Sequence, residues 1–216
     1  MRVRPSSYEL VLLASVIMLL AWSGIQPHDR FTWWLETAPI FIGVPALIWL
    51  YPTLRLTSLT YTLVWIHCLI LMLGGHYTYA RVPLGFWMED WLGFTRNNYD
   101  RIGHLAQGFV PAMLAREIFI RRSPLRGTRW LPFMVVCFCL AFSAFYELIE
   151  FWTALRAGGA ATDFLGTQGD VWDTQWDMQL ALIGSIVALL TLSGLQDRQL
   201  AGRGVPLDSV EARVRG

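Results

Sequence analysis

Six long apolar segments, separated by short charged patches, constrain this chain of 216 residues more than any other feature. A helix needs about 20 apolar residues to cross the hydrocarbon core of a bilayer. The segments run Leu10 to Ile25, Ala38 to Tyr51, Ser58 to Gly75, Ile102 to Ile120, Leu131 to Trp152 and Met178 to Leu195. Hydrophobic residues make up 55% of the chain. The sequence therefore predicts an all-α, polytopic membrane bundle of about six transmembrane helices.

The second segment is the least regular of the six. It is short and contains Pro39 and Pro45, and Trp33 and Trp34 precede it as an interfacial anchor would. Membrane helices tolerate proline where neighbouring helices satisfy the freed backbone groups. The segment is expected to span the membrane, with a pair of re-entrant pieces as the alternative.

Arginine placement predicts the orientation of the helices, because the chain has no lysine. Arginines that fall on one side of the predicted segments are Arg2, Arg4, Arg55, Arg116, Arg121, Arg122, Arg126, Arg129, Arg198, Arg203, Arg213 and Arg215. Only Arg30, Arg81, Arg96, Arg101 and Arg156 fall on the other side. The excess of arginine on cytoplasmic loops places both termini in the cytoplasm. Residues 1–195 then form the transmembrane domain, and residues 196–216 form a cytoplasmic polar tail.

The balance of charge also limits the partners of the chain. Its formal net charge is +1, and the local arginine surplus is explained by topology, so we expect no nucleic-acid partner. The basic segment from Arg121 to Arg129 is expected to touch anionic lipid headgroups. Membrane lipids are therefore the expected partners, and the sequence leaves open whether a protein also binds.

Residues capable of chemistry gather at the end of the predicted helices that carries few arginines. Spacing shows which side chains share a helix face: Asp100 and His104 are four residues apart, and Glu147 and Glu150 are three apart. Asp170, Asp173 and Asp177 likewise share one face, which continues as Ala181, Gly184 and Ala188. Small residues allow a neighbouring helix to come close, so the acidic face is expected to point into the bundle.

The glutamates require a cation, because Glu147 and Glu150 lie near a helix C-terminus, where negative charge is unfavourable. We predict a divalent metal bound through Glu147, Glu150, Asp173 and Asp177, with His104 as ligand or general base. Asp100 would fix the tautomer of His104, and Arg101 would lie near a phosphate or carbonyl oxygen of a substrate. Further polar residues expected in the pocket are His76, Asn97, Asp163, Gln168 and Asp170.

Two other interpretations of the acidic end stay open. In one, an ion-pair network locks the helix ends, with Asp100 and Asp173 as helix caps and arginines paired with the glutamates. In the other, converging carboxylates form an ion or proton pathway, as in transporters. The pathway is the less favoured interpretation, since no acidic or basic residue is expected midway along the predicted spans.

The motifs at the acidic end carry a family resemblance that covers most of the chain. The stretches His76 to Tyr79, Asn97 to His104, Glu147 to Glu150, and above all Gly166 to Met178 resemble the YjdF-type family of bacterial inner-membrane proteins, whose function is unknown. The second half is more remotely similar to VanZ-like membrane proteins. These resemblances imply the bacterial inner membrane, with a polar site on the outer side, but they imply no defined reaction.

The functional prediction is a membrane enzyme that uses a divalent metal to hydrolyse or transfer a group on a lipid or lipid-linked envelope substrate. The first alternative is a non-enzymatic factor that binds an envelope lipid or a protein through the same pocket and the aromatic segment from Phe86 to Phe94. The second is an ion- or proton-coupled transporter.

Overall fold

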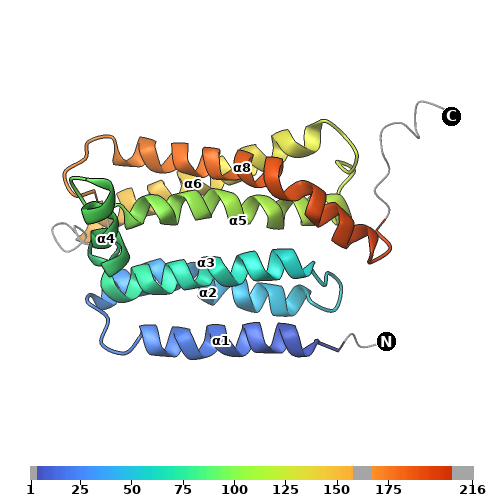
Figure 1. The fold of residues 1–216 in the computed structure, drawn as a ribbon, viewed down its shortest axis with the longest axis horizontal. Helices are drawn as coiled ribbons and strands as arrows, with labels where there is room; N and C mark the ends of the chain where they lie inside the picture. The colour runs from blue at the N-terminus through green and yellow to red at the C-terminus, as the bar shows by residue number, and fades with distance from the viewer. Residues whose placement is uncertain (1–3, 158–166, 206–216) are drawn as a thin grey trace.

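A computed structural model describes residues 4–157 and 167–205 of the chain, and its regular structure in these ranges is helical throughout (Figure 1). This confirms the predicted all-α class. The long helices are α1 (Ser7–Ser23), α2 (Arg30–Leu50), α3 (Ser58–Tyr77), α5 (Tyr99–Arg122), α6 (Trp130–Ala157) and α8 (Asp173–Ala201). Between α3 and α5 lie the 3₁₀ turn η1 (Tyr79–Arg81) and the short helix α4 (Pro83–Leu92).

Four of these helices, α2, α3, α6 and α8, are long and apolar enough to cross a membrane, and α1 is a shorter apolar helix of 17 residues. The second apolar segment forms one continuous helix, α2, with Pro39 and Pro45 inside it. It begins eight residues before the predicted start at Ala38, because the Asp29 carboxylate caps it by accepting a 2.6 Å hydrogen bond from the Thr32 amide. The structure therefore has one continuous helix here and not a pair of re-entrant pieces.

Helix α5 is the central helix of the bundle, and this position explains its polar composition. More than half of its 24 residues are buried, among them Asp100, His104, Gln107, Arg116 and Glu117. It packs against α3, α6 and α8. Polar side chains that would be costly against lipid tails are thus placed against other protein groups.

Two glycines bring α5 and α8 unusually close together. A Cβ atom added at Gly108 of α5 would overlap the backbone of Ala181, and one added at Gly184 of α8 would overlap the carbonyl of Leu105. Ala181 and Ala188 are fully buried in the same contact. The predicted face of small residues on the last helix is therefore confirmed, and it fixes where the acidic first turn of α8 lies relative to α5.

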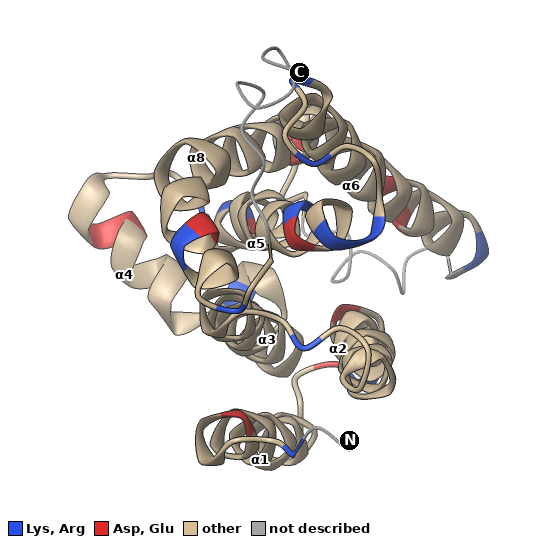
Figure 2. Cartoon of the chain, turned by 90° about the vertical axis from the view of Figure 1, so that its right-hand side faces the viewer, with Lys and Arg blue, Asp and Glu red and all other residues tan. Residues whose placement is uncertain are grey.

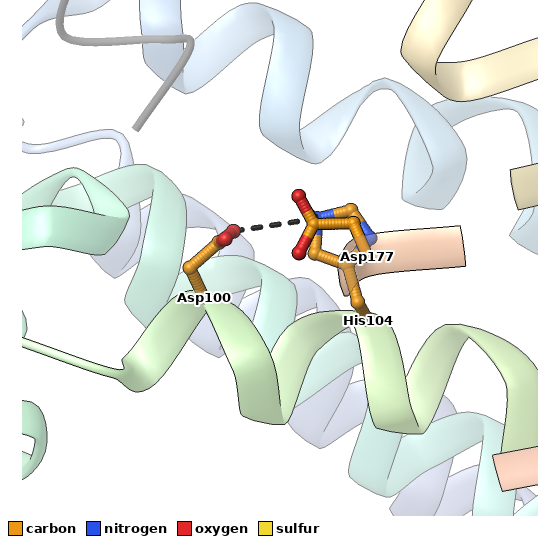
Figure 3. Close-up of side chains that lie close together, drawn as sticks. All are labelled: Asp100, His104 and Asp177. Atoms are coloured by element: carbon orange, nitrogen blue, oxygen red, sulfur yellow. Dashed lines mark ion pairs between the residues drawn. The ribbon is translucent and has the colours of Figure 1, made fainter. Parts of the chain in front are cut away.

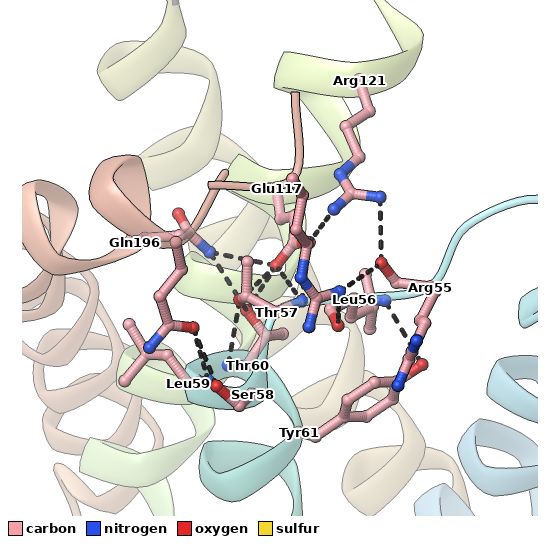
Figure 4. A network of polar contacts seen from close by, with 12 residues as sticks. Arg55, Leu56, Thr57, Ser58, Leu59, Thr60, Tyr61, Glu117, Arg121 and Gln196 are labelled. Carbon is pink, nitrogen blue, oxygen red and sulfur yellow. Dashed lines mark hydrogen bonds and ion pairs between the residues drawn. The ribbon is translucent and has the colours of Figure 1, made fainter. Parts of the chain in front are cut away.

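A buried polar network joins α3, α5 and α8 at the end opposite the acidic cluster (Figure 4). The fully buried carboxylate of Glu117 accepts hydrogen bonds from the Thr57 amide at 2.9 Å and from the Thr57 and Thr60 hydroxyls at 2.7 Å each, and it pairs with Arg121 at 3.0 Å. The Gln196 amide group donates to the Thr60 hydroxyl at 3.1 Å. Gln196 is buried in this network, and α8 continues to Ala201, six residues into the range predicted as a polar tail.

Arginines are concentrated at one end of the bundle and acidic residues at the other. Both termini of the described chain lie at the end that also holds the α2–α3 and α5–α6 connections (Figure 1). Arg121 and Arg203 there donate to the Arg55 carbonyl at 3.0 and 2.9 Å, and arginines ring this end in Figure 2. The opposite end is crossed by α4, whose Trp87 and Trp91 side chains are exposed. The chain thus has an arginine end and an acidic end.

We expect Gly184→Leu to destabilise the protein by about 2 kcal/mol, because the new side chain must push α8 away from the Leu105 carbonyl. The matched control is Gly194→Leu on the same helix, where an added Cβ meets no atom within 4 Å. Thermal unfolding in detergent checks the difference. Equal melting temperatures for the two variants would contradict the close packing.

We also expect Glu117→Gln to lower stability by about 3 kcal/mol, because the amide removes the charge that Arg121 pairs with and places a donor against the Thr57 N–H. Asp90→Asn, on the exposed part of α4, serves as the charge-matched control. The measurement is again thermal unfolding in detergent. A Glu117 variant as stable as the control would show that the network contributes little.

Candidate functional site

His104 lies at the centre of a buried cluster at the acidic end. Its Nε2 atom is 3.3 Å from Oδ1 of Asp100, one helical turn earlier on α5, and 3.7 Å from Oδ2 of Asp177 on α8. All three side chains are buried, and Figure 3 shows them converging from the two helices. The close packing of α5 on α8 is what brings Asp177 to the histidine. The predicted convergence of Asp100 and His104 is therefore present.

The other ring nitrogen of His104 is held by Gln107. The Nδ1 atom lies 2.9 Å from the Gln107 side-chain oxygen, which accepts a hydrogen bond from Nδ1–H. That tautomer leaves the Nε2 lone pair facing Asp100 and Asp177. Metal-binding histidines commonly donate their second nitrogen in this way. Gln107 is thus also placed to fix the tautomer, a role that the sequence predicted for Asp100 alone.

Glu147 and Glu150 approach the same histidine from α6. Oε1 of Glu147 is 3.9 Å from Nδ1 of His104. Two groups of three side chains have ligand atoms within 4.8 Å of one another: Asp100, His104 and Asp177 form one, and His104, Glu147 and Glu150 form the other. Because Gln107 already engages Nδ1, the first group is the better prepared to bind a cation through His104.

Two carboxylate oxygens in this cluster are buried without a hydrogen-bond partner among the described residues. They are Oδ2 of Asp100 and Oε1 of Glu147. A buried charged oxygen without a donor is costly, and most such atoms in proteins are satisfied. A bound cation between α5, α6 and α8 would satisfy both. The cluster therefore fits a hard or borderline divalent metal, for which carboxylate oxygens and an imidazole nitrogen are suitable ligands.

The arginines of the acidic end pair with the aspartates of α8 and its preceding turn. Arg101 donates to Asp177 at 2.6 Å, to Asp170 at 2.9 Å and to Asp173 at 3.1 Å. Arg96 donates to Asp173 at 2.9 Å. Asp173 therefore lies in an arginine cluster, outside both candidate ligand groups. The guanidinium of Arg101 is likewise committed to aspartates rather than open to a substrate oxygen.

The structure thus contains an ion-pair network, but its arginines pair with aspartates, whereas the sequence predicted pairing with the glutamates. No arginine contact to the glutamates of α6 is found in the part of the chain that the structure describes. Asp100 and Asp173 lie in the first turns of α5 and α8, whose cap residues Asn98 and Trp172 make no side-chain capping bond. Arg101 instead donates to Asp177 and Asp173 of α8 across the tight α5–α8 contact.

The remaining predicted pocket residues lie around the cluster rather than in it. His76 faces α1, where its Nδ1 is 3.0 Å from the Ser23 carbonyl and its ring stacks on Trp22. Asn97 is buried, donates to the Val82 carbonyl at 3.0 Å and is joined through its own carbonyl to Gln168 at 2.8 Å. These two residues hold the α3–α5 connection against the turn before α8. Asp163 lies outside the described residues.

Sequence reasoning missed Glu36, which is buried on α2. The predicted second span began at Ala38, so this carboxylate was assigned to no helix. Tyr79 and Tyr146 lie beside it. Burial raises the pKa of the Tyr79 phenol, in the connection after α3, well above its usual value, so this hydroxyl stays protonated and can donate. An acidic residue two turns into an apolar helix was the signal available in the sequence.

A cavity of about 320 Å³ opens from this cluster into the bundle. Its polar end is lined by Glu36, Asp100, His104 and Glu150, and its walls continue along α2, α3, α5 and α6. The acidic cluster is therefore accessible from a cavity, as a binding site requires.

Fold and site together define a multi-pass helical membrane protein with a buried carboxylate and histidine cluster at one end. The chain belongs to the DUF2238 family of predicted membrane proteins, whose family model matches residues 8–198. The inner membrane protein YjdF of Escherichia coli (strain K12) is 48% identical over 191 residues, which cover 88% of this chain and 91% of that relative. No solved structure matches the chain. The predicted YjdF-type family is thus confirmed, whereas the similarity to VanZ-like proteins stays a prediction.

We expect Arg101→Gln to destabilise the protein by about 3 kcal/mol or more, because three aspartates would lose their shared counter-charge. Arg81→Gln, an exposed arginine at the same end, is the control. Thermal unfolding in detergent measures both. If Arg101→Gln unfolds at the temperature of the control, the cluster is not what holds α8 against α5.

Proposed function

We propose that this inner-membrane protein crosses the membrane six times, through α1, α2, α3, α5, α6 and α8, with both termini in the cytoplasm. The separation of the arginine end from the acidic end supports this orientation, since arginine is enriched on cytoplasmic loops. The acidic end then faces the periplasm. The exposed tryptophans of α4 suit the headgroup region there.

The proposed activity depends on a divalent metal bound at the His104 cluster. The observation that carries the proposal is a pair of buried carboxylate oxygens beside a histidine, Asp100 Oδ2 and Glu147 Oε1, that have no hydrogen-bond donor among the described residues. His104 Nε2, Asp100 and Asp177 are the proposed ligands. Glu147 would complete the site from α6, with Glu150 beside it, and the pairing of Arg101 with Asp177 would position the Asp177 carboxylate.

The proposed reaction is hydrolysis or transfer at the headgroup of a lipid or lipid-linked envelope substrate. A metal at this position would polarise a phosphoryl or carbonyl oxygen and acidify a bound water. Glu150 lines the cavity and lies in the second ligand group, so it is the carboxylate best placed to accept a proton from an attacking hydroxyl or water.

A non-enzymatic role in binding a lipid or a protein partner is the second candidate, and one contact favours it. Asp100 Oδ1 is 3.3 Å from His104 Nε2, so a protonated histidine could neutralise the carboxylate without any metal. In that case the exposed aromatic side chains of α4 would be the contact surface.

Metal content tests the first candidate. We expect detergent-purified wild type, after exposure to zinc, manganese and magnesium, to retain near-stoichiometric metal on elemental analysis, and Asp100→Asn to lose most of it. The matched control is Asp173→Asn, which alters a carboxylate held by Arg96 and Arg101 outside both ligand groups. All three proteins should be monodisperse. Metal absent from the wild type, or equally retained by Asp100→Asn, would favour the second candidate.

A further inference from the structure

The cavity that begins at the acidic cluster continues deep into the apolar part of the bundle. On α2 its lining extends from Glu36 to Leu50, and on α5 it extends from Asp100 to Ile118. At 1.5 Å per residue, the 14 residues between Glu36 and Leu50 correspond to roughly 21 Å along the helix axis. One leaflet contributes about half of a hydrocarbon core of about 30 Å. The cavity is therefore longer than the hydrocarbon of one leaflet.

The two parts of the cavity differ in chemistry. The acidic end carries Glu36, Asp100, His104 and Glu150, whereas the walls beyond it are mainly aliphatic and aromatic, as with Ile40, Val44 and Leu47 of α2, Val110 and Leu114 of α5, and Phe142 of α6. A polar head and a long apolar chain would match these two environments in that order. Neither a free ion nor a small polar solute would use the apolar part.

One polar group interrupts the apolar wall. His67 of α3 lines the cavity, and its Nε2 atom is buried without a hydrogen-bond partner among the described residues. The residues around it on α2, α5 and α6 are apolar, so the wall as a whole still suits a hydrocarbon chain.

The arrangement of the helices leaves the cavity accessible from the side. Among the described residues, α2 packs closely on α3 but not on α5 or α6. At the acidic end, the Tyr146 hydroxyl of α6 donates a 3.3 Å hydrogen bond to the Leu35 carbonyl of α2. Beyond that end, a chain already in the membrane could enter between α2 and α6 without leaving the bilayer.

We propose that the cavity binds an amphiphile with one long hydrocarbon chain and a phosphate headgroup. The chain lies between α2 and the α5–α6 pair, and the cation at His104 bridges the phosphate to the carboxylates. This assignment rests on the proposed metal site, because the cluster itself is negatively charged and would repel a phosphate. It names the class of substrate on which the proposed activity would act.

Gly43 provides the means to block the apolar part without touching the acidic cluster. It lines the cavity, and a Cβ added there meets no atom within 4 Å, so a large side chain can enter the cavity without a backbone clash. Its neighbour Ile42 is 71% exposed and lies outside the cavity lining. Gly43→Trp and Ile42→Trp therefore place the same side chain in the cavity and outside it.

The test measures binding of two probes to purified protein loaded with manganese, by native mass spectrometry. The probes are lysophosphatidic acid, which has one acyl chain, and farnesyl phosphate, which has one isoprenoid chain; inorganic phosphate is the head-only comparison. We expect at least one probe to bind wild type and Ile42→Trp alike, to bind Gly43→Trp about tenfold more weakly or worse, and to bind better than inorganic phosphate. Preference between the probes identifies the type of chain.

The outcomes separate this proposal from the metal site. If Gly43→Trp keeps its metal but loses the chain probes, the cavity is the chain site. If Gly43→Trp binds both probes as wild type does, or if wild type binds neither probe better than inorganic phosphate, the chain site is overturned even when metal is present. If wild type holds no metal and binds neither probe, the bridging assignment is overturned together with the proposed function.

Discussion

The close contact between α5 and α8 is the interaction on which the rest of this structure depends. Gly108 and Gly184 allow the two backbones to approach to a separation that a single added methyl group would prevent. The contact aligns the first turn of α8 with that of α5, so that Asp177 meets both Arg101 and His104. Without it, Asp177 and Arg101 would face an apolar environment separately, at a cost that bilayer proteins avoid by pairing.

The two ends of the bundle satisfy their buried charges in different ways. At the arginine end, the Glu117 carboxylate accepts hydrogen bonds from Thr57 and Thr60 and pairs with Arg121. At the acidic end, Arg96 and Arg101 pair with the aspartates near α8, and Asp100 and Glu147 each keep one buried oxygen without a donor among the described residues. A buried carboxylate with several donors indicates a structural role, whereas carboxylate oxygens without donors beside a cavity are typical of a binding site.

Much of the fold was accessible from the sequence, because long apolar segments and helical spacing are local signals. The shared faces of Asp100 with His104 and of Asp170, Asp173 and Asp177 follow from 3.6 residues per turn. The choice of partners across helices does not follow from it, since a helix with apolar residues on every side gives no indication of its rotation. Arg101 was therefore assigned to a substrate instead of to aspartates, and Gln107 and Glu36 were overlooked.

The site draws its residues from helices that are far apart in the order of synthesis. Glu36 comes from the second helix and Asp177 from the last, with His104 and Glu150 between them. A nascent chain therefore places the glutamates of α6 in the bilayer before the α8 aspartates that occupy Arg101 have left the ribosome. The carboxylate and histidine cluster is therefore complete only once α8, the last helix in the sequence, has packed against α5.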